Sequence, residues 1–166
     1  MKNRTMDDLF YALLQDVYYA EKQLVKVLPK LAKNSANPHL QEAFTNHLEE
    51  TKGHVQRLEE AFGMIDKKPK AKKCDAILGI IAEGEEVMKE CVEDNVCDAG
   101  VLAAAQAAEH YEISRYGTLC AWAKQIGKPQ IARLLHETLE EEKKADALLS
   151  SIAEREVNKA AEEAAA

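Results

Sequence analysis

Apolar side chains recur three and four residues apart along almost the whole chain, which is the spacing of an amphipathic helix. The repeat breaks at Asn34 to Pro38, at residues 64–73 and at Gly127, where turn-forming residues gather. With 7 Gly and 4 Pro among 166 residues, the chain has too few turn formers for a sandwich or barrel of many short strands. The pattern therefore predicts an all-α protein, and the length suits a single domain.

Four long helices and a short one are expected between these breaks. The long helices cover about residues 6–33, 39–62, 99–125 and 129–157, and the short one covers about residues 75–91. Thr5 can cap the first helix through its hydroxyl, and Pro129 is a favourable first residue for the last. We expect residues 1–158 to form one helical bundle domain and the Ala/Glu tail at residues 159–166 to fray.

The order of these helices predicts how they connect. Short connections pair the first long helix with the second and the third with the fourth, and the segment with the short helix crosses between the two hairpins. A weak internal repeat supports this pairing, since the offset that places Glu21 over Glu112 also places Pro38 over Pro129. Two hairpins joined by one long crossover is the connectivity of the ferritin-like four-helix bundle.

The charge balance is acidic, with 29 Asp and Glu against 22 Lys and Arg and a formal net charge of −7. Nucleic-acid binding needs a basic face, so no nucleic-acid partner is expected, and the basic run at residues 67–73 is interpreted as a solvated linker. The chain shows neither an apolar stretch long enough to cross a membrane nor a signal peptide, which favours a soluble cytoplasmic protein without a membrane partner. Its four cysteines form no Cys-x-x-Cys pair, so we expect reduced, structural thiols.

Ionisable side chains interrupt the apolar stripe of every long helix at about the same depth. They are Glu21 on the first helix, His47, Glu50 and His54 on the second, Glu109 and Glu112 on the third, and Glu142 on the fourth. A single glutamate on such a stripe usually lies at its edge and reaches water. The same interruption on four helices is less easily explained in this way, because an isolated buried carboxylate is costly or takes up a proton.

A pair of metal ions would compensate these charges, since Glu and His together bind iron or manganese in the cores of helical bundles. In the usual pattern, two helices each supply one Glu and the other two each supply Glu-x-x-His. Glu21 and Glu112, related by the repeat, fit the first part of this pattern. The second part differs, because Glu50 and His54 are four residues apart and Ala145 stands where the repeat would place another histidine.

Two assignments within this set need a choice. The repeat relates Glu50 to Glu141, whereas the apolar stripe of the last helix selects Glu142, and we take Glu142 as the ligand. His47 and His110 are interpreted as structural, and the tyrosines near the stripe as packing residues or hydrogen-bond donors. The predicted metal ligands are Glu21, Glu50, His54, Glu109, Glu112 and Glu142, and no side chain is assigned a catalytic role.

Four segments are distinctive in combination. They are Asp16-Val-Tyr-Tyr-Ala-Glu21-Lys-Gln-Leu24, His47-Leu-Glu-Glu-Thr-Lys-Gly-His54, Glu109-His-Tyr-Glu-Ile-Ser-Arg-Tyr-Gly117 and Thr138-Leu-Glu-Glu-Glu-Lys143. Together they resemble the YciE/YciF family of bacterial stress proteins, over about residues 5–155. The resemblance implies a ferritin-like bundle of the rubrerythrin type, a homodimer and a role in stress responses. It also implies metal ligands at Glu21, Glu50, Glu109, Glu112 and one of Glu141 and Glu142, while at His54 family members can carry glutamine.

The expected function is that of a stress-associated protein with a dinuclear centre in the bundle core, containing two iron ions or alternatively manganese. Such a centre would act on dioxygen, peroxide or ferrous iron, as a ferroxidase or a peroxide-removing oxidoreductase. The alternative is a non-catalytic metal-binding or structural dimeric stress protein. Without a Cys-x-x-Cys pair, no rubredoxin-like electron-transfer site is expected.

Overall fold

The computed structural model describes residues 5–164, and every regular element within that range is helical. The elements are α1 (Met6–Asn34), α2 (Pro38–Gly63), α3 (Asp75–Glu90), α4 (Asp94–Gln125), α5 (Pro129–Ile152), a π-helical turn (Ala153–Val157) and α6 (Asn158–Ala164). The all-α prediction is confirmed, and each expected helix is present. No helix in the described range is long and apolar enough to span a membrane.

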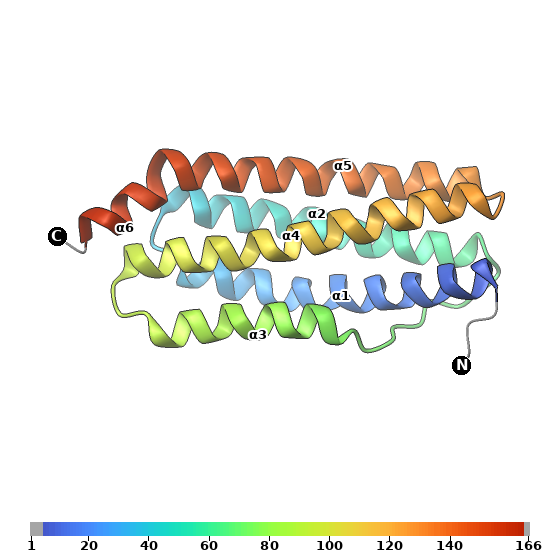
Figure 1. Ribbon diagram of the computed structural model, residues 1–166, viewed down its shortest axis with the longest axis horizontal. Helices are drawn as coiled ribbons and strands as arrows, with labels where there is room; N and C mark the ends of the chain where they lie inside the picture. Colours follow the sequence, from blue (N-terminus) through green and yellow to red (C-terminus); the bar gives the residue numbers. More distant parts are fainter. Residues whose placement is uncertain (1–4, 165–166) are drawn as a thin grey trace.

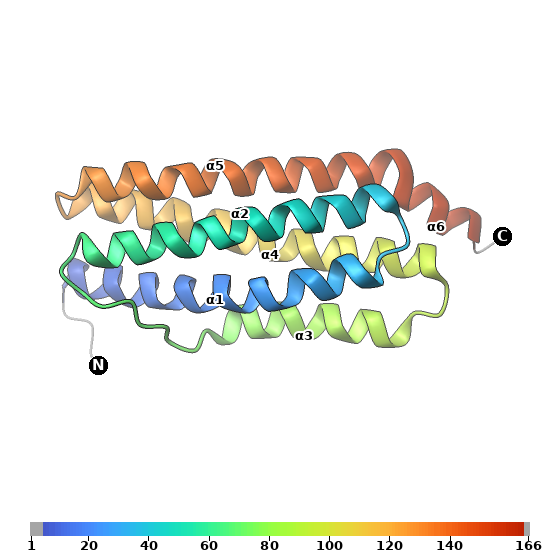
Figure 2. The same cartoon turned by 180° about the vertical axis from the view of Figure 1, so that it is seen from behind.

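The long helices α1, α2, α4 and α5 lie side by side along the length of the molecule (Figure 1 and Figure 2). α1 packs against α2 and α4 packs against α5, so two hairpins build the bundle. α3 lies outside it, against α4 and against the half of α1 that is farther from the N-terminus. The connection at residues 64–74 runs back along α1 to reach α3, and the Lys72 amide donates to the Gln15 carbonyl at 3.2 Å.

Capping side chains set the helix ends. The hydroxyl of Thr5 accepts from the amide of Asp8, and the Asp8 carboxylate accepts from the Thr5 amide, which forms the capping box of α1. The side chain of Asn37 caps α2. The buried carboxylate of Asp98 on α4 accepts from the amides of Ala36 and Asn37, and this contact holds the α1–α2 connection against α4.

Two helix boundaries differ from the sequence prediction. α4 begins at Asp94 rather than near residue 99. Beyond α5 the chain continues through the π-helical turn into α6, so the tail that we expected to fray from residue 159 is helical as far as Ala164. This part of the chain is helical because α6 packs against α4, a tertiary contact.

The prediction of four reduced cysteines is wrong for one pair. Cys91 and Cys97 form a disulfide across the α3–α4 connection. The first turn of α4 brings Cys97 back toward the end of α3, so that the two Cα atoms are 5.4 Å apart. Cys74 and Cys120 are free and buried.

Two separate clusters of buried apolar side chains form the core. The first, called the Phe10 cluster below, includes Phe10, Leu14, Leu58, Leu119 and Leu135. The second, called the Leu28 cluster, includes Leu28, Leu40, Val101, Leu149 and, from α3, Ile77. Every long helix contributes to both clusters, and the buried ionisable residues of the next section lie where each helix passes from one cluster to the other.

Candidate metal centre

Ionisable side chains from all four long helices meet in the layer between the two apolar clusters. They are Glu21 from α1, His47 and His54 from α2, Glu109 and Glu112 from α4, and Glu142 from α5. All of them are buried, and Glu142 has no exposed surface at all. Charges this far from water are stable only if they compensate one another, take up protons or bind a counter-charge.

The ligand atoms of these residues fall into two overlapping groups, each with its atoms within 4.8 Å of one another. The groups are His47, Glu109, Glu112 and Glu142, and Glu21, His54 and Glu142. Glu142 Oε2 lies 3.5 Å from His47 Nε2, and Glu142 Oε1 lies 2.9 Å from His54 Nδ1. The carboxylate of Glu142 therefore lies between the two groups and contacts both.

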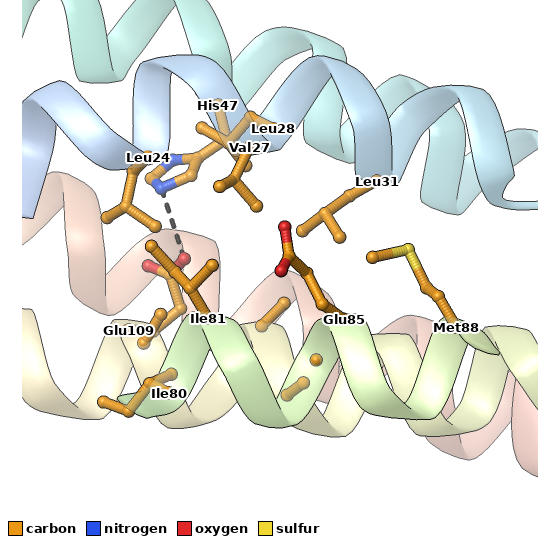
Figure 3. Close-up of a pocket in the computed structure, with 14 residues that line it drawn as sticks. Leu24, Val27, Leu28, Leu31, His47, Ile80, Ile81, Glu85, Met88 and Glu109 are labelled. Atoms are coloured by element: carbon orange, nitrogen blue, oxygen red, sulfur yellow. Dashed lines mark ion pairs between the residues drawn. The ribbon is translucent and has the colours of Figure 1, made fainter. Parts of the chain in front are cut away.

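Each group also contains a second close contact between a histidine and a glutamate. Nε2 of His47 is 3.2 Å from Oε1 of Glu109, the contact drawn as a dashed line in Figure 3. Nδ1 of His54 is 3.4 Å from Oε1 of Glu21. Both histidines thus direct one ring nitrogen into the carboxylate layer.

The other ring nitrogen of each histidine is held by a carboxylate outside the layer. Oε2 of Glu50 lies 3.1 Å from Nδ1 of His47, and Oε2 of Glu141 lies 2.9 Å from Nε2 of His54. Arg57 donates to both oxygens of Glu141, at 2.5 and 2.9 Å. Outer carboxylates of this kind fix the ring orientation and the tautomer of a metal-ligating histidine. Glu50 and Glu141 are repeat-related, so each hairpin supplies one such carboxylate.

Many buried polar atoms of the layer have no hydrogen-bond partner within the described part of the chain. They are Oε2 of Glu21, Oε2 of Glu109 and both carboxylate oxygens of Glu112. In the described range, the oxygens of Glu142, Nε2 of His47 and Nδ1 of His54 have no partners apart from the histidine–carboxylate ion pairs described above. Buried polar atoms are nearly always paired, so a concentration of unpaired acceptors marks a place for a counter-charge. Carboxylate oxygens with imidazole nitrogens are a donor set that suits iron and manganese. The residues therefore fit the centre that the sequence predicted.

The layer raises the pKa values of its own members. Burial, together with the charges of Glu142 and Glu21, holds the pKa of Glu112 well above its usual value. Burial and the neighbouring carboxylates raise the pKa of Glu142 to about 8 against the opposing hydrogen bond from His54. Burial alone would lower the pKa of His54, but Glu21 and Glu142 outweigh it and raise the pKa to about 10. These groups retain protons that a bound cation would displace.

Tyr116 of α4 is a fully buried hydrogen-bond donor to the layer. Its hydroxyl donates to Oε1 of Glu21. Burial and the charge of Glu21 keep the Tyr116 pKa well above its usual value, so the hydroxyl remains a donor. Tyr18 has a different role, since its hydroxyl donates to Glu59 at 2.8 Å outside the layer.

The structure brings together five of the predicted ligands and leaves one outside. Those that meet are Glu21, His54, Glu109, Glu112 and Glu142. The side chain of Glu50 is 48% exposed and contacts the layer only through His47. His47, which we had interpreted as structural, takes the inner position instead. The signal for it was present in the sequence, because His47 and His54 are two helical turns apart on one face.

A hollow of about 190 Å³ reaches the layer from the side of α2 and α5. Asn46, Glu50 and Lys144 lie in its lining beside apolar residues such as Phe44 and Leu149, and it extends to His47 and Glu109. A hydrated cation or another polar molecule can approach the centre along this path without losing all its hydrogen-bond partners.

The fold and the site define a class of protein, an all-helical bundle with a buried layer of glutamates and histidines at mid-length. The family model described as "Domain of unknown function (DUF892)" matches residues 5–162, and the chain belongs to this family. It is 46% identical over 163 residues to Protein YciF of Escherichia coli (strain K12), with 98% of each chain covered. The resemblance to the YciE/YciF family is thereby confirmed.

Solved structures show the same arrangement of helices. The crystal structure of the E. coli stress protein YciF matches with a TM-score of 0.90 at 46% identity and covers 95% of this chain and 99% of its own. YcfI from Rhodopseudomonas palustris matches with a TM-score of 0.89 at 45% identity, over 90% and 96% of the two chains. A protein from Xanthomonas campestris pv. campestris, only 20% identical, shares the fold with a TM-score of 0.78, over 98% and 100% of the chains.

Proposed function

We propose that this protein is a ferritin-like stress protein that binds two iron ions, or alternatively manganese, in the layer between the two apolar clusters. The observation that carries the proposal is the set of buried carboxylate oxygens without hydrogen-bond partners on α1, α4 and α5, beside two ring nitrogens from α2. Four of these oxygens, on Glu21, Glu109 and Glu112, have no hydrogen-bond partner within the described chain, and the two oxygens of Glu142 contact the ring nitrogens of His47 and His54 in the same small volume. Bound iron or manganese would supply a redox couple that can react with dioxygen or peroxide.

The residues divide into inner and outer roles. His47, Glu109 and Glu112 would hold one ion, Glu21 and His54 the other, and Glu142 would contact both. Glu50 and Glu141 are positioning residues, since each holds the outer nitrogen of one histidine. Tyr116 donates to Oε1 of Glu21, and Oε2 of Glu21, which has no hydrogen-bond partner in the described range, would be available to hold the ion.

Protons and water are controlled by the same residues. Burial raises the pKa values of Glu112 and Glu142, so both carboxyl groups would release protons on binding a cation. The Phe10 and Leu28 clusters exclude water from both ends of the layer, which strengthens electrostatic interactions inside it. The chemistry we propose is oxidation of ferrous iron or removal of peroxide in a cytoplasmic homodimer.

A structural role without metal is the alternative. It is favoured by the contacts of His47 and His54 with the carboxylates, because protonated histidines at these positions compensate part of the negative charge. The metal centre and the structural role predict different effects on the protein when a buried carboxylate is neutralised. Without metal, loss of a buried charge stabilises the fold or leaves it unchanged, whereas in a metal centre it removes a ligand.

Metal analysis after anaerobic loading with ferrous iron or manganese tests the proposal. The wild-type protein should retain about two ions per chain, and Glu142→Gln should lose most of this capacity. Glu140→Gln is the matched control, because Glu140 lies on the same helix with an exposed side chain. Loaded protein should then consume dioxygen or peroxide faster than the same concentration of free ion. Wild-type protein that retains no metal refutes the centre, and metal retention without faster consumption refutes the oxidoreductase activity alone.

A further inference from the structure

An apolar pocket lies between α1, α3 and α4 and ends at the metal-binding layer (Figure 3). Val27 and Leu28 of α1 face Ile81 and Met88 of α3 across it, and His47 with Glu109 closes its inner end. The pocket exists because α3 lies outside the bundle and covers only part of the groove between α1 and α4. It therefore joins the candidate centre to a helix that contributes no ligand to that centre.

The size of this pocket restricts what can occupy it. Its volume is about 30 Å³, and a single water molecule needs about 10–15 Å³ of such space. A molecule of two or three heavy atoms fits this volume.

The lining restricts the occupant further. Apart from the layer itself, the only ionisable side chain on the pocket is Glu85, and Lys30 lies 3.6 Å from its carboxylate. A cation or a hydrogen-bonding molecule such as peroxide would lose its water partners along this path without gaining new ones. An uncharged diatomic molecule has no such partners to lose.

The hollow beside α2 and α5 differs from this apolar pocket in its lining. Asn46, Glu50 and Lys144 line that hollow, and it reaches the same pair, His47 and Glu109. The centre therefore has two approaches of different chemistry, a hollow whose mixed lining includes three polar side chains and a pocket whose lining is almost wholly apolar. Cations and peroxide are suited to the hollow beside α2 and α5, so neither is expected to enter through the apolar pocket.

We propose that the apolar pocket beneath α3 is the binding position and entry route of dioxygen to the His47–Glu109 side of the centre. The use made of this dioxygen rests on the proposed function, but its presence in the pocket depends on the pocket alone. Ile81 is the residue that controls passage, because its side chain projects from α3 toward Glu109 and is half-buried.

Methyl NMR of the metal-free protein under dissolved dioxygen tests occupancy without any reaction. Dioxygen is paramagnetic, so methyl groups beside it relax faster. The methyl groups of Ile81, Val27 and Leu28 should show several-fold larger oxygen-dependent relaxation than those of Ile113, which is equally half-buried but packs against the Phe10 cluster. Equal effects at these positions overturn the proposal. In Ile81→Phe the effect at Val27 should fall to the level of Ile113, and persistence of the full effect would count against the pocket.

Kinetics on the iron-loaded protein test the route. Ile81→Phe should slow the reaction with dioxygen several-fold and Ile81→Ala should accelerate it, while metal content and reaction with peroxide stay at wild-type values. Leu148→Phe, which narrows the hollow beside α2 and α5 instead, should leave the dioxygen rate unchanged. Unchanged dioxygen rates in both Ile81 variants refute the route. If the wild-type protein binds no metal, the proposed function fails, and the NMR measurement still decides whether dioxygen occupies the pocket.

Discussion

Glu142→Gln is expected to stabilise the metal-free protein at alkaline pH and to destabilise the metal-loaded protein. Burial and neighbouring carboxylates raise the pKa of Glu142 to about 8 from an ordinary value of 4.5. A group whose pKa is higher in the folded state contributes stability that is complete below the unfolded-state value and is lost as the pH rises through the folded-state value. His54, with its pKa raised from 6.5 to about 10, adds a loss of the same sign at higher pH.

The magnitude follows from the difference between the two pKa values. One unit of difference corresponds to about 1.4 kcal/mol. Integrated from about pH 5 to about pH 8, Glu142 alone removes about 3 kcal/mol from the free energy of unfolding of the metal-free wild type. The Glu142→Gln variant lacks this titration, so the two proteins should be nearly equal in stability at the lower pH and the variant more stable at the higher.

Urea unfolding followed by circular dichroism, in a chelator and at a series of pH values, measures this difference. Glu140→Gln serves as control, since its exposed side chain should give wild-type behaviour. With iron or manganese bound, the order of stability should reverse, because the variant binds the ion less tightly and gains less from it. A wild-type stability that stays level or rises between about pH 5 and about pH 8 in chelator would refute the reasoning.

Three further variants test contacts at and away from the centre. Glu50→Gln weakens the contact that holds Nδ1 of His47, so it should reduce metal affinity by about 10–100-fold, measured by competition with a chelator. The stability of the metal-free protein should change little. Unchanged metal affinity would contradict the positioning role of Glu50. Asp98→Ala removes the acceptor for two backbone amides and should cost about 1–3 kcal/mol in urea unfolding, and a neutral result would show that water replaces it. The double variant Cys91→Ser, Cys97→Ser should lower the free energy of unfolding by about 2 kcal/mol, by the loop-closure relation for a short loop. In thermal unfolding, adding reductant to the wild type should lower its stability to that of the double variant, and a wild type that does not respond to reductant would show that the disulfide does not form in solution.

Most helix boundaries were predictable from local sequence signals, and those that were not depend on tertiary contacts. Thr5 and Pro129 predict the starts of two helices, and in the structure α1 begins directly after Thr5 and α5 begins at Pro129. The first turn of α4 carries no apolar stripe, so its start at Asp94 could not be read from periodicity. That turn is held by the disulfide to Cys91, and a disulfide depends on the approach of two helix ends, which no spacing of cysteines reveals.

The candidate site was predictable as a layer but not residue by residue. Periodicity places Glu21 and Glu112 on the buried face, and both lie in the layer with no exposed surface. On α2 the same periodicity allows either His47 or Glu50 to face inward, because the two side chains lie on adjacent parts of one face. Which of them does so depends on where the partner helices α4 and α5 lie around α2, which is a property of the packed bundle.

The division of the core has a consequence for how the protein unfolds. The Phe10 and Leu28 clusters are two separate groups of packed apolar side chains, and the layer between them consists of ionisable side chains instead of apolar contacts. In the metal-free protein the two ends of the bundle should therefore exchange amide hydrogens with different opening free energies. Ions bound as we propose would connect all four long helices at the layer, so the two ends should then open as one unit, and metal availability would set the folding cooperativity of the bundle.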